Sequence, residues 1–399
     1  MKETNFKHTD IGDIPHDWNV KTVAQITDIV TGATPSTANS TYWENGDIPW
    51  MSSGELNKKI IYQVDGRITQ KGYDNSGTHM IPKHCVLIGL AGQGKTRGTA
   101  AYNEIELCTN QSIAAILPNK GVLDSRYLYY QTDSKYDFLR LMSAGDGGRG
   151  GLNKQILLGL SFPFPPSIAE QQRIATALSQ MDELISALDE QINKKLLIKQ
   201  AAMQQLLTAK TRLNGFSEPW VEKKLGEVAD VIMGQSPSSD SYNTLGVGLP
   251  LIQGNADIKN RKSIINVYTS QYNKTCEIND IIMSVRAPVG AIGKASYKSC
   301  LGRGVCAIKS HSEFLYHYLI FIEKDWSKLS SGSTFDSING DILRNRITFV
   351  PSSLPEQQAI ASILTAMDNE IQALQAQRDK YTLIKQGMMQ QLLTGKIRI

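Results

Sequence analysis

The feature that most constrains this chain is a long internal repeat. Residues 170–212 and 356–398 align without a gap at a separation of 186 residues, and 25 of the 43 aligned positions are identical. A repeat this clear indicates the architecture before any motif is considered. Each copy opens with a glutamate shortly after a proline, and negative charge is favourable at the N-terminus of a helix. The repeat therefore predicts two long helices that alternate with two other blocks.

Apolar side chains recur along both copies at alternating spacings of four and three residues, which is typical of the seam of a coiled coil. The seam consists of Ile174, Leu178, Met181, Ile185, Leu188 and Ile192 in the first copy and Ile360, Leu364, Met367, Ile371 and Leu374 in the second. Neither helix can bury such a seam alone. Each could pack into its own domain core, pair with another chain, or pair with the other copy. Equal lengths and matching seams within one chain favour the last arrangement.

The segments before the helices also repeat, although more weakly. Six residues recur at a separation of 202: Trp18, Lys21, Asp28, Gly32, Pro35 and Ser36 match Trp220, Lys223, Asp230, Gly234, Pro237 and Ser238. We therefore predict an α+β protein in which two mixed α/β blocks are separated by two long helices that form an antiparallel coiled coil. The predicted segments are a first block at 1–163, a first helix at 164–213, a second block at 214–349 and a second helix at 350–399.

Composition favours an ordinary globular protein of the cytoplasm. With 399 residues, of which 41% are hydrophobic, the chain is long enough for two cores. Its first residues are too polar for a signal peptide, and no apolar run reaches the ~20 residues that cross a membrane, so no membrane partner is expected. The five cysteines contain no CxxC pair, which favours buried reduced thiols over disulfides or zinc: Cys85, Cys108, Cys276, Cys300 and Cys306.

Catalytic and metal-binding motifs are weak in this sequence. Residues 89–96, GLAGQGKT, satisfy the P-loop pattern, but an extended Gly-containing stretch follows where a phosphate-binding helix would begin. The equivalent stretch of the second block, 281–297, lacks Gly-Lys-Thr, so we interpret both as hairpins. His311 and His317 lack a third metal ligand. We therefore expect no catalytic residues and no metal site on this chain.

The helix motifs carry a resemblance to a known family. The segments PPSIAEQQRIATALSQMDELI and LPEQQAIASILTAMDNEI open the helices, and KQAAMQQLLTAK and KQGMMQQLLTGK close them. With FKHTDIGDIPHDW near the start and IIMSVRAPVGAIGKA in the second block, this pattern resembles the specificity subunit of Type I restriction-modification systems over nearly the whole chain.

The resemblance implies a function that catalytic motifs did not supply. In that family each block is a target recognition domain that reads one half of a split DNA sequence. The helices form a spacer and dock two methyltransferase subunits, which recruit two motor-nuclease subunits. Double-stranded DNA is then the substrate, and S-adenosylmethionine, ATP and Mg²⁺ belong to the partner subunits, with no cofactor on this chain. The alternative is a coiled-coil scaffold that binds protein alone.

A net charge of +4 is small for a DNA-binding protein, so its cations would have to gather on one face or act beside other subunits. Arginine forks would read guanine and lysines would contact phosphate, although each residue could equally be a solvated surface cation. The candidates are Lys58, Lys59, Arg67, Lys71, Tyr73, Lys95, Arg97 and Arg149 in the first block and Lys259, Arg261, Lys262, Arg286, Lys294 and Arg303 in the second. Residues 145–151 and 330–334 are predicted to be loops that contact the DNA backbone.

Overall fold

The computed structural model describes residues 5–92, 94–119, 121–143, 151–330 and 337–399. The chain divides into two compact units, and each unit takes part of both long helices. Unit 1 consists of Met1–Leu188 with Gln377–Ile399, and unit 2 of Asp189–Ala376. These units group each block with part of each helix. The division into four consecutive segments that the sequence suggested stays a prediction.

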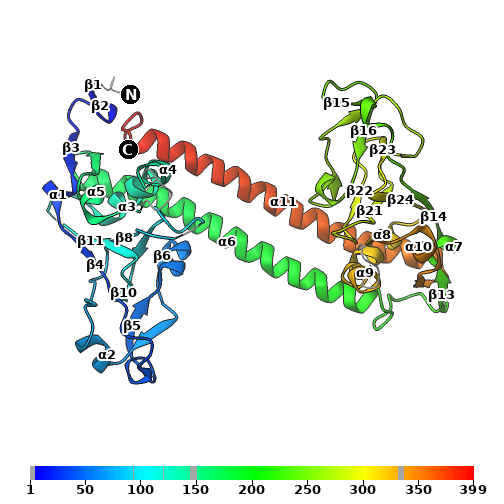
Figure 1. Ribbon diagram of the computed structural model, residues 1–399, viewed down its shortest axis with the longest axis horizontal. Coiled ribbons are helices and arrows are strands. Elements are labelled where there is room, and N and C mark those ends of the chain that lie inside the picture. Colours follow the sequence, from blue (N-terminus) through cyan, green and yellow to red (C-terminus); the bar gives the residue numbers. More distant parts are fainter. Residues whose placement is uncertain (1–4, 93, 120, 144–150, 331–336) are drawn as a thin grey trace. The chain divides into compact units, whose positions relative to one another are not determined.

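The two long helices are α6 (Ile168–Leu206) and α11 (Leu354–Leu392), each of 39 residues (Figure 1). The buried carboxyl-bearing side chains of Glu170 and Glu356 lie in their first turns, where the helix dipole favours negative charge. Beyond the helices, Ala209 and Gly395 adopt left-handed φ angles of 56° and 71°. This conformation is common just past a helix C-terminus, and its recurrence shows that the two copies end in the same way.

Unit 1 combines several small sheets with short helices. A five-stranded sheet has the order β4 (Ile29–Thr31), β11 (Ile113–Ile116), β8 (Val86–Gly89), β9 (Ala100–Asn103) and β6 (Ile60–Ile61). A three-stranded sheet has the order β10 (Cys108–Thr109), β5 (Ile48–Met51) and β7 (Gly66–Ile68). Two pairs remain: β1 (Phe6–Thr9) with β2 (Gly12–Pro15), and β3 (Asn19–Thr22) with β12 (Ser161–Phe164). The helices are α1 (Val23–Ile26), α2 (Gln70–Asp74), α3 (Ser125–Asp133), α4 (Tyr136–Met142) and α5 (Lys154–Leu158).

Unit 2 repeats this plan. Its six-stranded sheet has the order β14 (Ala229–Met233), β24 (Val305–Ser310), β21 (Ile281–Ser284), β22 (Ile292–Lys294), β18 (Lys262–Ser263) and β17 (Ile258–Lys259). A second sheet has the order β15 (Tyr242–Asn243), β19 (Tyr268–Thr269), β16 (Leu249–Ile252), β23 (Ser299–Leu301) and β20 (Thr275–Cys276). β13 (Trp220–Lys224) pairs with β25 (Ile347–Pro351) as β3 pairs with β12. The helices are α7 (Leu225–Val228), α8 (Glu313–Phe321), α9 (Glu323–Ser330) and α10 (Gly340–Asn345).

The repeated glycines have a steric cause. A Cβ on Gly32 would lie 1.9 Å from the Thr109 carbonyl oxygen, and one on Gly234 would lie 2.1 Å from that of Gly302. The chain just after β4 and just after β14 therefore passes a neighbouring backbone at a distance that no side chain permits. The weak repeat between the blocks thus marks a shared fold, and the equivalent strand orders agree with it.

Each block core extends onto the helices of its own unit. Ile174 and Leu178 of α6 join the main core of unit 1 together with Leu392 and Leu393. Met203 and Leu206 join the main core of unit 2 together with residues of α11 such as Leu364. Of the eleven seam residues, seven are buried and Met181, Ile185, Met367 and Leu374 are half-buried. Each block therefore packs against the helix ends of its own unit.

The GLAGQGKT stretch folds as the hairpin that the sequence indicated. Strands β8 and β9 flank it and pair antiparallel, with Val86 opposite Tyr102 and Ile88 opposite Ala100. Gly92, Gly94 and Gly98 adopt positive φ angles in the connection. Because the chain turns back into a strand, no helix N-terminus follows the glycines to bind a phosphate. All five cysteines are buried.

Candidate DNA-recognition modules and helix clamps

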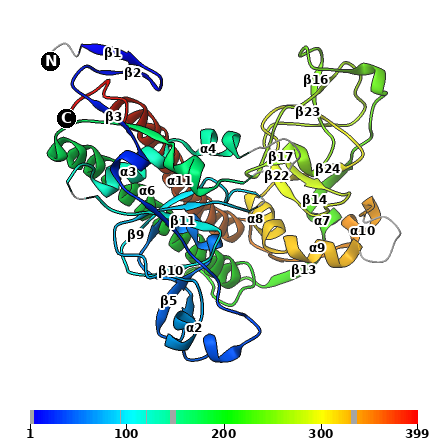
Figure 2. The same ribbon diagram turned by 60° about the vertical axis from the view of Figure 1, so that its left-hand side comes forward.

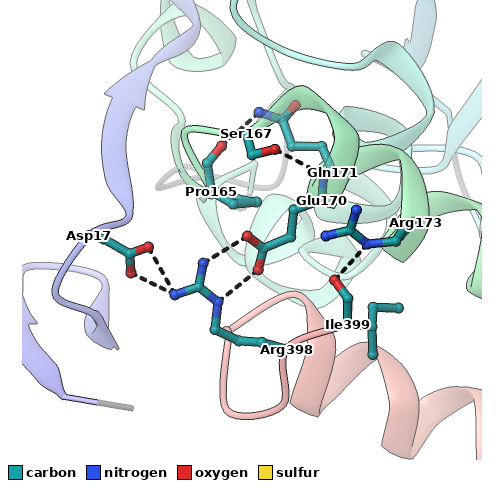
Figure 3. A network of polar contacts seen from close by, with 8 residues as sticks. All are labelled: Asp17, Pro165, Ser167, Glu170, Gln171, Arg173, Arg398 and Ile399. Atoms are coloured by element: carbon teal, nitrogen blue, oxygen red, sulfur yellow. Dashed lines mark hydrogen bonds and ion pairs between the residues drawn. The ribbon is translucent and has the colours of Figure 1, made fainter. Parts of the chain in front are cut away.

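An arginine-carboxylate network joins both ends of the chain in unit 1 (Figure 3). Arg398, which lies beyond α11, donates to both oxygens of Glu170 at 2.8 and 2.7 Å and to the carboxylate of Asp17 at 2.8 and 2.9 Å. The hydrogen bonds with Glu170 raise the pKa of Arg398. Arg173 donates to the backbone oxygen of Ile399 at 2.9 Å. The C-terminal residues are thus fixed on the first turns of α6, and Figure 2 shows the C-terminal end of the chain in unit 1.

Unit 2 repeats this clamp at equivalent positions. Arg212 follows α6 as Arg398 follows α11, and it donates to both oxygens of Glu356 at 3.0 and 2.6 Å. The Glu356 side chain is fully buried. Trp220 also donates its indole N–H to Glu356 at 3.2 Å. In both units, then, the residues after one helix hold the start of the other.

A second repeated contact lies further along the helices. In unit 1, Lys385 of α11 pairs with Asp182 of α6, and Tyr130 of α3 donates to the same carboxylate at 2.8 Å. In unit 2, Lys199 of α6 pairs with Asp368 of α11. Lys195 of α6 also pairs with Glu370 of α11. From one pair to the next, the residue number rises along α6 and falls along α11. The helix segments in each unit are therefore antiparallel.

The partner of Asp368 from the block differs between the units. His317 of α8 occupies the position of Tyr130, and its Nδ1 lies 3.8 Å from the Asp368 carboxylate. Its Nε2 makes a 2.9 Å hydrogen bond with Thr365, whereas Nδ1 has no hydrogen-bond partner. Burial lowers the pKa of His317 to about 4. The imidazole is accordingly neutral near pH 7, and among the described residues no cluster that could hold a metal ion is found.

Four of the predicted DNA-contacting cations are engaged by carboxylates of their own unit. Lys58 pairs with Glu55 and Asp65, and Lys59 with Asp133. Arg261 makes a two-point pair with Glu323, and Lys294 pairs with Glu313. The pKa values of Lys58 and Arg261 are raised mainly by the hydrogen bonds with Glu55 and Glu323. Each of these cations is already partly neutralised by a carboxylate of its own unit, so it contributes less positive charge to a DNA-binding surface.

Another group of predicted residues is exposed, and its members have no ion pair with any described carboxylate. Arg67 lies on β7, Lys71 on α2 and Lys95 in the β8–β9 hairpin; Lys259, Lys262, Arg286 and Arg303 lie on strands or turns of unit 2. The structure brings Arg261, Lys262 and Lys294 together, because the backbones of Lys262 and Lys294 lie opposite each other in the parallel strands β18 and β22. Asn260 and Arg261 both have positive φ, which makes the β17–β18 connection a tight two-residue turn.

Tyr73 and Arg97 are both partly buried, on α2 and in the β8–β9 hairpin. Arg149 lies outside the described residues, as do residues 145–150 and 331–334 of the two predicted loops. The roles of all these residues in DNA contact stay predictions.

Sequence reasoning missed an aromatic pocket in unit 1. Its volume is about 480 Å³, and its lining is Thr34, Thr37, Ser40, Trp43, Glu44 and Trp50. The rings of Trp43 and Trp50 meet edge to face, with centroids 5.0 Å apart and an angle of 89° between the planes. The signal was present, because two of the five tryptophans lie within the polar stretch TYWENGDIPW. Tryptophans in such a polar segment are unusual enough to indicate a binding surface.

The geometry described above defines a class: two duplicated α+β modules, each built on an antiparallel pair of helix segments. Within the described residues, no helix is long and apolar enough to cross a membrane. The sequence matches the model of the Type I restriction modification DNA specificity domain over residues 15–197 and 217–380. The chain therefore belongs to the family of Type I restriction-modification specificity subunits.

Individual relatives agree with this assignment. A putative Type I restriction enzyme specificity subunit, MjaX, of Methanocaldococcus jannaschii is 30% identical over 426 residues, which cover 100% of this chain and 98% of the relative. The MjaIX specificity subunit of the same organism is 26% identical over 446 residues, covering 100% and 97%. A crystal structure of a Type I restriction-modification S subunit from M. genitalium has a TM-score of 0.66 at 17% identity, covering 98% and 97%, and so shares the fold. These similarities favour DNA specificity over a protein-binding scaffold.

Proposed function

We propose that this chain is the non-catalytic specificity subunit of a cytoplasmic Type I restriction-modification complex, in which each block reads one half of a bipartite DNA site. The observation that carries the proposal is the duplication. Both blocks share a common strand order, to which the second block adds β15, β17 and β20, and both have the same clamp to the helices, yet they differ in the side chains that they expose. Shared folds with different surfaces suit two modules that meet similar grooves and read different bases.

Recognition would combine backbone and base contacts. The exposed cations of each block would neutralise phosphates and fork onto guanine, as in other DNA-reading proteins. Cations that already pair with carboxylates, such as Arg261 with Glu323, would instead stabilise the loops in which these cations lie. The partner subunits, two methyltransferases and two motor-nucleases, would supply catalysis and bind S-adenosylmethionine, ATP and Mg²⁺.

The helices offer a repeated surface for the methyltransferases. Leu197 on α6 and Leu383 on α11 occupy equivalent positions and are 67% and 68% exposed. Ile198 and Ile384 follow them, 46% and 40% exposed. Apolar groups exposed at the same place in both copies indicate protein contact, since solvent alone would not favour them. One methyltransferase on each patch would account for two copies per complex.

A docking test follows from this repeat. Leu197→Lys should remove one methyltransferase from the complex and Leu383→Lys the other, while the double variant binds none; mass measurement of the assembled complex reads the stoichiometry. Gln191→Lys and Gln377→Lys are matched controls, because they add the same charge at exposed equivalent positions. Two methyltransferases on the double variant would disprove this docking surface.

A block exchange tests the central proposal. Replacing residues 14–163 with the corresponding block of a relative should change one half of the methylated sequence and leave the other half unchanged. Methylation mapping of host DNA, with the partner subunits present, gives the result directly. If both halves changed together, or neither changed, the assignment of one block to one half-site would be wrong. Methylation by the purified chain without partners would contradict its non-catalytic role.

A further inference from the structure

The aromatic pocket of unit 1 has the features of a site for a planar ring. Trp43 donates its indole N–H to the Ser36 carbonyl and Trp50 donates to that of Ala33, each at 3.1 Å. The two polar edges are therefore satisfied by the backbone, and the carbon atoms of both rings remain to line the pocket. Aromatic walls of this kind attract flat, polarisable groups by stacking.

The walls are held in place before any ligand arrives. Trp50 lies on β5 opposite Gly66 of β7, and a Cβ on Gly66 would lie 3.2 Å from the Trp50 ring. The absent side chain lets the indole lie against this strand. Trp43 directly follows the 3-10 helix Ser40–Tyr42, on which α2 packs through a hydrogen bond from Thr69 N to the Tyr42 carbonyl at 2.9 Å. A fixed pocket loses little entropy when a ring enters.

The polar residues that line the pocket restrict which chemical groups a bound ring can carry. Glu44 is exposed and lines the pocket together with the exposed residues Thr37 and Ser40. Thr34 also lines the pocket, but its hydroxyl already donates to Gln111 at 2.6 Å. A phosphate would be repelled by the carboxylate, whereas an exocyclic amino group would donate to it, as the N4 amino group of cytosine does to acidic side chains. Lys71 lies on the adjacent α2 and is exposed, at a place where it could contact a neighbouring phosphate.

We propose that this pocket receives one unstacked nucleobase of the first half-site, and that the base carries an exocyclic amino group, as cytosine and adenine do. Trp43 stacks against the ring, Trp50, whose plane lies at 89° to that of Trp43, meets its edge, and Glu44 accepts a hydrogen bond from its amino group. The inference rests on the proposed DNA-reading function and adds a specificity-determining site to it.

The second block provides an internal contrast. Its corresponding loop, between the 3-10 helix Ser239–Ser241 and β16, carries Leu245, which is 86% exposed. Asn243 fixes this loop by accepting from the backbone N–H groups of Leu245 and Val247 at 3.1 and 3.0 Å. Tyr242 directly follows this 3-10 helix, as Trp43 follows the first one, and Leu251 of β16 lies opposite Cys300 as Trp50 lies opposite Cys108. The second block therefore lacks the pair of indoles, and the proposal concerns the first half-site alone.

A thermodynamic cycle tests the proposal. The assembled complex would be titrated with duplexes that carry the mapped recognition site, each with one abasic position. With the native chain, one abasic position in the first half-site should weaken binding about ten-fold, the range expected for loss of one stacked base. With Trp43→Ala the same abasic position should change binding less than about two-fold, because the stacking partner is already missing. Trp43→Phe should restore the difference.

Controls separate this inference from the function on which it rests. Leu245→Ala changes the equivalent loop and should leave the abasic profile of the first half-site as in the native chain. Glu44→Gln, at an exposed position, should fold normally and reduce discrimination between amino-bearing and keto-bearing bases at the same position. If specific binding persists but no position couples to Trp43, or if the coupled position lies in the second half-site, the pocket assignment is overturned. If the native complex shows no sequence preference at all, the proposed function itself fails.

Discussion

Arg212 lies against Glu356 as a two-point ion pair, and the carboxylate is fully buried while the guanidinium keeps some contact with solvent. The same pair recurs as Arg398 with Glu170 in unit 1. In both cases the residues beyond one long helix neutralise a glutamate in the first turn of the other. The clamp therefore couples the end of each helix copy to the start of the other, and its arginine and glutamate are among the residues that the two copies share.

Breaking this clamp should be costly. Arg212→Ala leaves the buried Glu356 carboxylate without its cation, and removal of one member of a buried pair typically costs about 3–5 kcal/mol. We expect a decrease of this order in the free energy of unfolding, measured by urea denaturation. Arg173→Ala is the control, because Arg173 is exposed and contacts a backbone oxygen alone; a loss below about 1 kcal/mol is expected there. Equal losses in both variants would show that the clamp is not a stabilising contact.

The buried histidine predicts an acid-sensitive unit 2. Its pKa is about 4 in the folded chain, against 6.5 ordinarily, chiefly because burial disfavours the charged form. Between these pH values the unfolded chain binds more protons than the folded one, so the unfolding free energy decreases as the pH falls from 6.5 to 4. The two pKa values correspond to roughly 3 kcal/mol. Asp368, Lys199, Glu313 and Lys294 also act on this pKa.

Unit 1 suggests the variant for this measurement. His317→Tyr places the side chain of Tyr130 at the equivalent site, where a hydroxyl can donate to Asp368 as Tyr130 donates to Asp182. The variant should lose the part of the acid sensitivity that His317 causes, as seen in unfolding curves at pH 7 and pH 4.5. His311→Tyr is the control, since that side chain is exposed. An unaltered pH dependence in His317→Tyr would show that His317 does not cause it.

Seam and non-seam leucines of the first helix should contribute unequally to stability. Leu178 is fully buried in the core that α6 shares with its block, so Leu178→Ala should cost about 2–5 kcal/mol. Leu184 lies on the same helix but is 37% exposed, and its removal should cost below about 1 kcal/mol. Urea titration of both variants gives the comparison. A similar cost at the two positions would contradict the packing described for Leu178.

The repeat made the larger part of the fold predictable from the sequence. The repeated helix segments predicted two long helices, and matching residues such as the glycines at 32 and 234 predicted blocks of one fold. The paired state of the cations was not predictable, because Lys59 meets Asp133 and Arg261 meets Glu323 across long stretches of sequence. Such pairs depend on how strands and helices are packed. The pocket depended in the same way on Gly66, which lies on another strand than Trp50 but leaves room for the Trp50 ring.

This difference between paired and exposed cations predicts how salt should act on DNA binding. A lysine that neutralises a phosphate contributes about 0.9 to the slope of log K against log salt concentration. Lys262 is exposed without a described carboxylate partner, so Lys262→Gln should reduce the slope by nearly this amount while the preferred sequence is retained. Lys298 pairs with Glu277 at 2.7 Å, and Lys298→Gln should leave the slope unchanged.

Arg261→Gln should lower the melting temperature of the chain because Glu323 loses its two-point partner. Binding measured at four salt concentrations distinguishes the three variants. Equal slopes for Lys262→Gln and Lys298→Gln would show that freedom from internal ion pairs does not select the phosphate contacts.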